Sequence, residues 1–224
     1  EVPPLALNFW RWLFAFLVVL TWTWRELYRH RELVRQKWKY ISFLALSSAI
    51  GFGALHYVAL QYTTAINGAL FQGVMSICIL IAALVILGDR FGGRESVGVV
   101  LGFCGVAFIV TRGDIDVLIG LTFNIGDIIL LAATMSYSVY AVFLRRAPKE
   151  LSSSALMAGM FGFAALYMLP LMLIELYVFD RTFTINTTAI WSIGFMTFGP
   201  SVLAQIFWAY SVSKVGPGRA GYFI

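Results

Sequence analysis

The sequence contains a run of 49 residues, 40–88, without a single aspartate, glutamate, lysine or arginine. A bilayer core about 30 Å thick is crossed by roughly 20 helical residues, so this run is long enough for two crossings. The whole chain of 224 residues is 60% hydrophobic and 12% charged, whereas an average soluble domain has about 25% charged residues. The sequence therefore predicts a multi-span membrane protein and excludes a soluble globule.

Apolar runs bounded by charges, glycine or proline divide the chain into predicted spans. Seven are complete and an eighth begins near residue 217. The complete spans cover residues 5–24, 40–61, 66–88, 96–112, 126–146, 153–176 and 189–212. Backbone polar groups in lipid must be hydrogen-bonded within each segment, so the spans are expected to be helices. We predict an all-α, polytopic membrane helix bundle.

The basic residues indicate the orientation of the spans. When successive loops are assigned alternately to two sides, 13 of the 16 lysine and arginine residues fall on one side. The other side carries only Arg11, Arg112 and Arg181. Because loops rich in lysine and arginine stay in the cytoplasm, the basic loops are predicted to be cytoplasmic and the protein to lie in the inner or plasma membrane. The net charge of +5 is thus explained by topology, and no nucleic-acid partner is expected.

A displacement of 152 residues superposes part of the span pattern on itself. Spans 5–24 and 40–61 fall on 153–176 and 189–212, and the equivalent loops change sides. Such a change of sides is typical of inverted repeats in secondary transporters. We expect ten helices in two inverted five-helix halves, of which about seven and a half are present in an internal fragment. The predicted domains are a first repeat without its first helix, an external linker and a truncated second repeat, over residues 1–112, 113–125 and 126–224.

Several short motifs along nearly the whole chain resemble the EamA-type permeases of the drug/metabolite transporter superfamily. The motifs are Arg11-Trp-Leu-Phe-Ala15, Ala59-Leu-Gln-Tyr-Thr-Thr-Ala65 with Leu87-Gly-Asp-Arg90, Gly98-Val-Val-Leu-Gly-Phe-Cys-Gly105, Gly126-Asp127 with Tyr137 to Arg146, and Gly216-Pro-Gly-Arg-Ala220. The chain departs from the family pattern at Ser76, where a proline is frequent, and in lacking the first and last helices. The resemblance implies ten helices, cytoplasmic termini and transport of small metabolites, with amino acids and related solutes exported by many members.

Two stripes of polar residues follow helical spacing within predicted spans. Polar side chains in lipid usually face the bundle interior or a cavity. Gly68, Gln72 and Ser76 share one face of span 66–88, and Asn67 lies beside them at its outer entry. A second stripe on span 189–212 follows Gly199-Pro200, where the proline is expected to kink the helix; it consists of Thr197, Ser201, Gln205 and Trp208. Each stripe lines a substrate cavity or forms hydrogen bonds to a neighbouring helix, and the sequence leaves both open.

Other polar or aromatic residues also have two interpretations. His56 relays protons or is a neutral hydrogen-bonding residue, and Arg11 attracts an anionic solute or extends to the outer headgroups. Tyr137 and Tyr140 line a cytoplasmic vestibule or pack as aromatic residues. Asp127 is expected to cap its helix, and Glu175 to lie at the interface. The predicted substrate pathway consists of Arg11, His56, Asn67, Gln72, Ser76, Tyr137, Tyr140, Ser201, Gln205 and Trp208.

The sequence offers little for chemistry. It has only two histidines, no pair of aspartates within a span and no cluster with metal-ligand spacing, so no catalytic residue, metal or cofactor is predicted. We predict a secondary transporter that moves a small metabolite by alternating access, with export favoured. The alternatives are a seven-span receptor or a membrane scaffold without transport. The expected partners are a small-molecule substrate, the lipid bilayer and, through the small-residue face at Gly98 and Gly102, a possible second copy.

Overall fold

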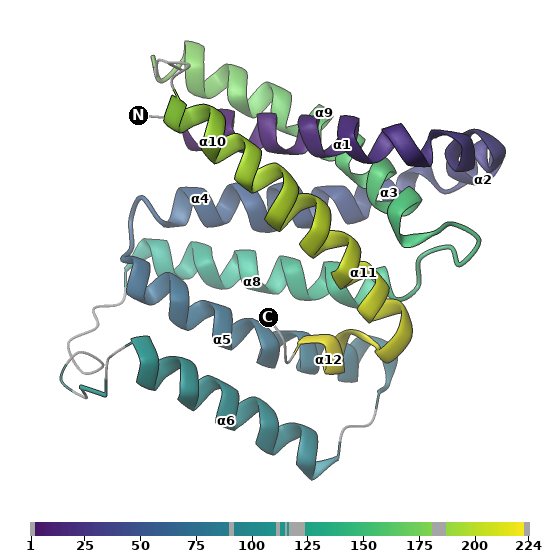
Figure 1. Ribbon diagram of the computed structural model, residues 1–224. Coiled ribbons are helices and arrows are strands. Elements are labelled where there is room, and N and C mark those ends of the chain that lie inside the picture. Colours follow the sequence, from purple (N-terminus) through teal and green to yellow (C-terminus); the bar gives the residue numbers. More distant parts are fainter. Residues whose placement is uncertain are drawn as a thin grey trace. The chain divides into compact units, whose positions relative to one another are not determined.

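The computed structural model describes residues 3–89, 92–110, 113–114, 116, 124–180 and 187–221 (Figure 1). Within these residues all regular secondary structure is helical. The predicted all-helical fold is therefore confirmed. The ten-helix inverted repeat and the fragment ends stay predictions.

The chain forms two compact units, each built from two separate stretches of sequence. Unit 1 contains Glu1–Ile50 and Ala147–Tyr210, and unit 2 contains Gly51–Arg146 and Ser211–Ile224. Unit 1 holds α1 (Pro4–Arg29), α2 (Arg31–Gln36), α3 (Trp38–Ala45), α9 (Ser153–Tyr177), α10 (Thr187–Met196) and η3 (Thr197–Leu203). Unit 2 holds α4 (Leu55–Ala59), α5 (Ala65–Ala82), η2 (Ala83–Leu87), α6 (Gly93–Val110), α8 (Ile125–Leu144) and α12 (Pro217–Ala220). The unit boundaries cross η1 (Leu46–Ala54) and α11 (Ala204–Val215).

Six continuous helices of the described residues are long and apolar enough to cross a membrane. They are Pro4–Arg29, Trp38–Ala59, Ile66–Leu87, Ile125–Leu144, Ser153–Tyr177 and Ala189–Val215, and each matches a predicted span. The predicted span 96–112 overlaps α6, which is not among these six helices, and its residues 111 and 112 lie outside the described residues. The predicted eighth span begins where α12 does. The first helix is longer than its apolar run of 5–24, because the following arginine, glutamate and leucine residues favour a helix even outside lipid.

Three membrane helices contain a π-helical segment: η1, η2 and η3. Pro200 lies inside η3, where its missing N–H interrupts regular α-helical bonding. The kink predicted at Gly199-Pro200 stays a prediction, but the proline lies within a π-helical segment. Shifted by 152 residues, η1 would cover residues 198–206, which overlap η3. Such segments occur frequently at functional sites.

Candidate functional site: the transport pathway and its supporting contacts

In unit 1, α1 and α9 pack against each other in antiparallel directions and are joined at both ends. The N–H of Ala6, near the start of α1, donates to Glu175 Oε2 at 2.8 Å, near the end of α9. At the other end, Ser152 donates through its backbone N–H and its hydroxyl to the two oxygens of Glu26, at 2.7 and 2.8 Å. Each helix thus supplies a carboxylate to the N-terminus of its neighbour, where free N–H groups and the helix dipole favour a negative charge.

The interior of the same pair combines aromatic packing with one buried amide. The rings of Trp12 and Phe161 are 5.3 Å apart, and the Nδ2 of Asn8 donates to the sulfur of Met168 at 3.3 Å. Asn8 is fully buried, and its Oδ1 has no hydrogen-bond partner among the described residues. Sequence analysis missed Asn8, although an amide inside the first apolar run could have been noticed.

Unit 1 contains four of the predicted pathway residues. The Arg11 guanidinium lies over the Trp12 ring, 4.5 Å from its centroid. Ser201 is buried, and its hydroxyl donates to the Met196 carbonyl at 2.8 Å within the same helix. Gln205 and Trp208 lie on α11 and are partly buried. The Ser201 hydroxyl is therefore already bonded to the backbone of its own helix.

Unit 1 also contains an apolar groove that sequence analysis did not predict. It has a volume of about 450 Å³ and lies between α1 and the continuous helix α10–η3. Its lining consists of Trp10, Phe14, Val18, Ala189, Ile190, Ile193, Gly194, Thr197 and Phe198. The polar groups of its lining side chains are the Thr197 hydroxyl and the Trp10 indole N–H. The groove could not be predicted because it depends on how two helices far apart in sequence pack.

In unit 2, a buried carboxylate joins the beginnings of α5 and α8. Asp127 is 1% exposed, and its Oδ1 accepts hydrogen bonds from Thr63 Oγ1 at 2.6 Å and Asn67 Nδ2 at 2.9 Å. Its Oδ2 accepts from the Asn124 N–H at 3.0 Å, while the Asp127 N–H donates to Asn124 Oδ1 at 3.2 Å. This reciprocal arrangement is a capping box, so the expected capping function of Asp127 is confirmed. The Asn67 Nδ2 is engaged by this contact, whereas its Oδ1 is buried without a hydrogen-bond partner among the described residues.

An aromatic cluster occupies the interior of unit 2. The Phe52 ring lies 5.2 Å from the His56 ring and 4.9 Å from the Tyr137 ring, and Tyr137 lies 5.2 Å from Tyr140. Tyr140 is fully buried and Tyr137 is 7% exposed. The structure thus brings three predicted pathway residues together through Phe52, a residue that the predicted set did not include.

Gln72 and Ser76 differ in their surroundings although they lie one turn apart on α5. The Ser76 hydroxyl donates to the Gly221 carbonyl at 2.7 Å, which ties α5 to the residue after α12. Gln72 is partly buried, and its amide forms no hydrogen bond with any described residue. Of the two, Gln72 is the side chain that retains its hydrogen-bonding capacity for a solute.

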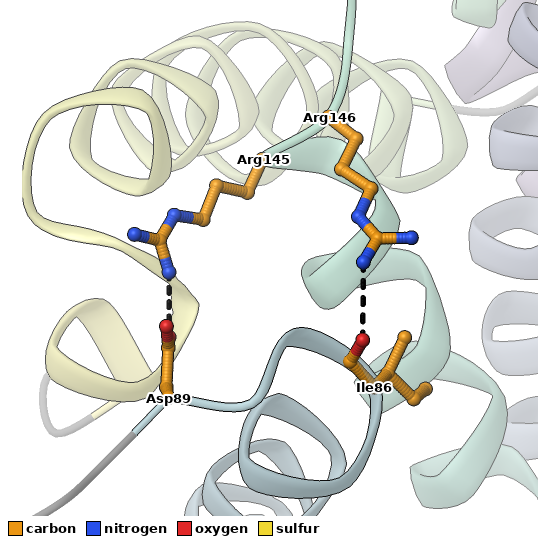
Figure 2. A network of polar contacts seen from close by, with 4 residues as sticks. All are labelled: Ile86, Asp89, Arg145 and Arg146. Atoms are coloured by element: carbon orange, nitrogen blue, oxygen red, sulfur yellow. Dashed lines mark hydrogen bonds and ion pairs between the residues drawn. The ribbon is translucent and has the colours of Figure 1, made fainter.

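Two adjacent arginines join the ends of α8 and η2, as Figure 2 shows. Arg145 Nη1 lies 2.5 Å from Asp89 Oδ2, and Arg146 Nη2 donates to the Ile86 carbonyl at 3.0 Å. The Arg145 guanidinium also lies close to Gly216: a Cβ added to Gly216 would be 3.5 Å from Arg145 Nη1. Gly216 has a φ of 86°, a conformation that favours glycine. Asp89 and Arg145 both belong to motifs that carry the family resemblance, but sequence analysis gave them no function.

The ten predicted pathway residues are thus divided between the units. Unit 1 holds Arg11, Ser201, Gln205 and Trp208, and unit 2 holds the other six. Within unit 2, Asn67 and Ser76 serve contacts between elements, whereas Gln72 and the His56 imidazole form no hydrogen bond with described residues. That these ten residues form a substrate pathway stays a prediction.

Comparisons with known proteins place this helical architecture in a family. The sequence profile of the EamA-like transporter family matches residues 1–111 and 124–224. An uncharacterized transporter of Bacillus subtilis, YyaM, is 27% identical over 219 residues, which cover 96% of this chain and 70% of that protein. An uncharacterized transporter of Archaeoglobus fulgidus is 26% identical over 227 residues, covering all of this chain and 75% of the other.

A solved structure shows the same fold. That structure, described as "Crystal structure of protein", superposes with a TM-score of 0.80 at 18% identity, over 99% of this chain and 74% of its own. The fold and the apolar helices define an integral membrane protein of the transporter class. The chain belongs to the EamA-like transporter family, which confirms the resemblance noted in its motifs.

Proposed function

We propose that this transporter moves a small metabolite, an amino acid or a related solute, by alternating access and in the direction of export. The basic loops would face the cytoplasm, and the membrane would be the inner or plasma membrane. The family supports transport as such, and the charge distribution supports the orientation. Membership in a transporter family also favours transport over the receptor and scaffold alternatives.

The proposal rests on the Gln72 side chain, whose amide forms no hydrogen bond with the described residues. This amide lies within a membrane helix and is partly exposed. An amide offers two donors and an acceptor, which suit the ammonium and carboxylate groups of a zwitterionic solute. Polar side chains within membrane spans are costly, so an amide without a hydrogen-bond partner among the described residues supports a function in the pathway.

Alternating access requires parts that stay intact and parts that deform. The α1–α9 pair and the α5–α8 pair are each joined at both ends, so each would move as a rigid body. The boundary between the compact units crosses η1 between Ile50 and Gly51. We propose that η1 bends during the cycle, because π-helical segments and glycines weaken regular helical bonding.

Counterflow into proteoliposomes tests the function. Proteoliposomes that contain the full-length protein are preloaded with a pool of unlabelled amino acids and metabolites. They should accumulate at least one labelled member of that pool from the outside. Gln72→Ala should then lower kcat/KM for this solute by about tenfold, the equivalent of one hydrogen bond to a charged group. Gln36→Ala, which changes an exposed glutamine on α2, is the matched control and should leave transport unchanged. Unchanged kinetics in a correctly inserted Gln72→Ala variant would refute the assignment of Gln72.

A further inference from the structure

The segment that links the first two membrane helices carries a dense cluster of exposed cations. It comprises the end of α1, the whole of α2 and the start of α3, residues 22–39, and we call it the basic collar. Its six cationic residues are all exposed: Arg25, Arg29, Arg31, Arg35, Lys37 and Lys39. α2 has no buried residue. The collar is therefore held by its two flanking helices and offers its side chains outward.

Aromatic rings are interleaved with these cations. Trp22 and Trp24 are each 52% exposed, Tyr28 is 66% exposed and Trp38 is 47% exposed. Arg25 lies 5.3 Å from the Trp24 ring centroid, and Arg31 lies 4.9 Å from that of Tyr28. Lys39 lies 5.9 Å from the Trp38 centroid. Rings with one apolar face and one polar edge are most stable at the level of lipid headgroups.

The carboxylates of the collar do not neutralise its cations. Glu26 is engaged by Ser152 at the start of α9, and Glu32 forms no ion pair within the described residues. None of the six cationic side chains forms an ion pair there either. The collar thus presents six positive charges with one carboxylate, Glu32, left among them.

We propose that the basic collar binds the phosphate headgroups of anionic phospholipids. Because α1 and the helix Trp38–Ala59 are both long and apolar enough to cross the membrane, the short segment between them is expected at the membrane surface. Arginine and lysine at that depth attract anionic lipid, and arginine donates to phosphate oxygens in a planar fork. The exposed tryptophans favour a lipid partner over an acidic soluble protein, since they reach the acyl region beside the phosphates. Glu26 links the collar to α9, so bound lipid would also hold the α1–α9 pair at the surface.

Selective retention of anionic lipid tests the proposal. The tagged full-length protein, immobilised in an uncharged detergent, is equilibrated with mixed micelles of phosphatidylglycerol and phosphatidylcholine that share the same acyl chains. After washing, the two lipids are quantified per protein by mass spectrometry. We expect phosphatidylglycerol to be enriched about fivefold, and the enrichment to disappear at an ionic strength of about 1 M, where the Debye length is ~3 Å. Equal retention of the two lipids by the wild-type protein would overturn the proposal.

Variants assign the retention to the collar. The triple variant Arg29→Gln, Arg31→Gln, Arg35→Gln should lose most of the enrichment, whereas the same three residues changed to lysine should keep it because the charges remain. Lys149→Gln removes one exposed charge outside the collar and should retain as much lipid as the wild type, whereas Arg35→Gln alone should retain less. These side chains are exposed, so folding is expected to be preserved. A triple glutamine variant that retains lipid as the wild type does would contradict the proposal.

Discussion

The α1–α9 pair of unit 1 and the α5–α8 pair of unit 2 are both joined at their helix ends by polar contacts, but the helices run in opposite relative directions in the two pairs. In the first pair the helices are antiparallel, so each N-terminus lies beside a C-terminus. In the second pair Asp127 joins the two beginnings and Arg145 and Arg146 join the two ends, so the helices are parallel. Antiparallel helix dipoles attract each other, and parallel dipoles repel.

This difference explains where the charged residues are placed. In the antiparallel pair, the carboxylates of Glu26 and Glu175 each come from near the C-terminal end of one helix and neutralise the N-terminus of the other. In the parallel pair, two positive helix ends share the single carboxylate of Asp127. At the other ends, Arg146 donates to the Ile86 carbonyl and Arg145 pairs with Asp89. We therefore expect the stability of the parallel pair to depend more heavily on a few charges, with Asp127 the most important of them.

The largest effect is expected for Asp127→Ala. The substitution leaves the donors of Thr63, Asn67 and Asn124 without their acceptor and two helix N-termini without a negative charge. We expect a loss of about 3 kcal/mol in the free energy of unfolding. Denaturation in mixed micelles with increasing SDS measures it. A loss no larger than that of Glu26→Ala would contradict the view that the parallel pair depends more on its charges.

Glu175→Ala should have an intermediate effect on the antiparallel pair. Glu175 is 5% exposed and accepts one hydrogen bond from the Ala6 N–H. Its loss exposes the uncapped start of α1 and should cost about 2 kcal/mol in the same denaturation assay. Glu175→Gln keeps an acceptor and removes the charge, so it should recover about half of this loss. Equal losses in both variants would show that the charge alone matters.

The smallest effect is expected at the Asp89–Arg145 ion pair. The side chains are 27% and 43% exposed, and exposed ion pairs contribute about 0.2–1 kcal/mol. Asp89→Ala and Arg145→Ala should each lower stability by less than about 1 kcal/mol. The charge exchange Asp89→Arg with Arg145→Asp should restore most of the loss seen in either single reversal. Additive losses in the double variant would show that the pair contributes no coupling.

Local features of these pairs could be predicted from sequence, and distant partnerships could not. The membrane helices follow from long, mostly apolar runs, and the cap at Asp127 follows from its place at the start of one run. The bonds Glu26–Ser152 and Ala6–Glu175 join residues 126 and 169 positions apart, and a single sequence does not indicate such pairings. Ser76 and Gln72 looked equivalent in the helical stripe, because only the packing of α12 shows that Ser76 is engaged.

Labelling of a single cysteine at position 72 tests most directly whether α5 lines the solute pathway. In a Gln72→Cys variant with Cys78 and Cys104 replaced by serine, membrane-impermeant thiol reagents are applied to each side of the membrane in turn. Alternating access predicts labelling from both sides, and slower labelling when the solute found by counterflow is present. Labelling that the solute leaves unchanged, or no labelling from either side in a transport-competent variant, would contradict a solute pathway lined by α5 at position 72.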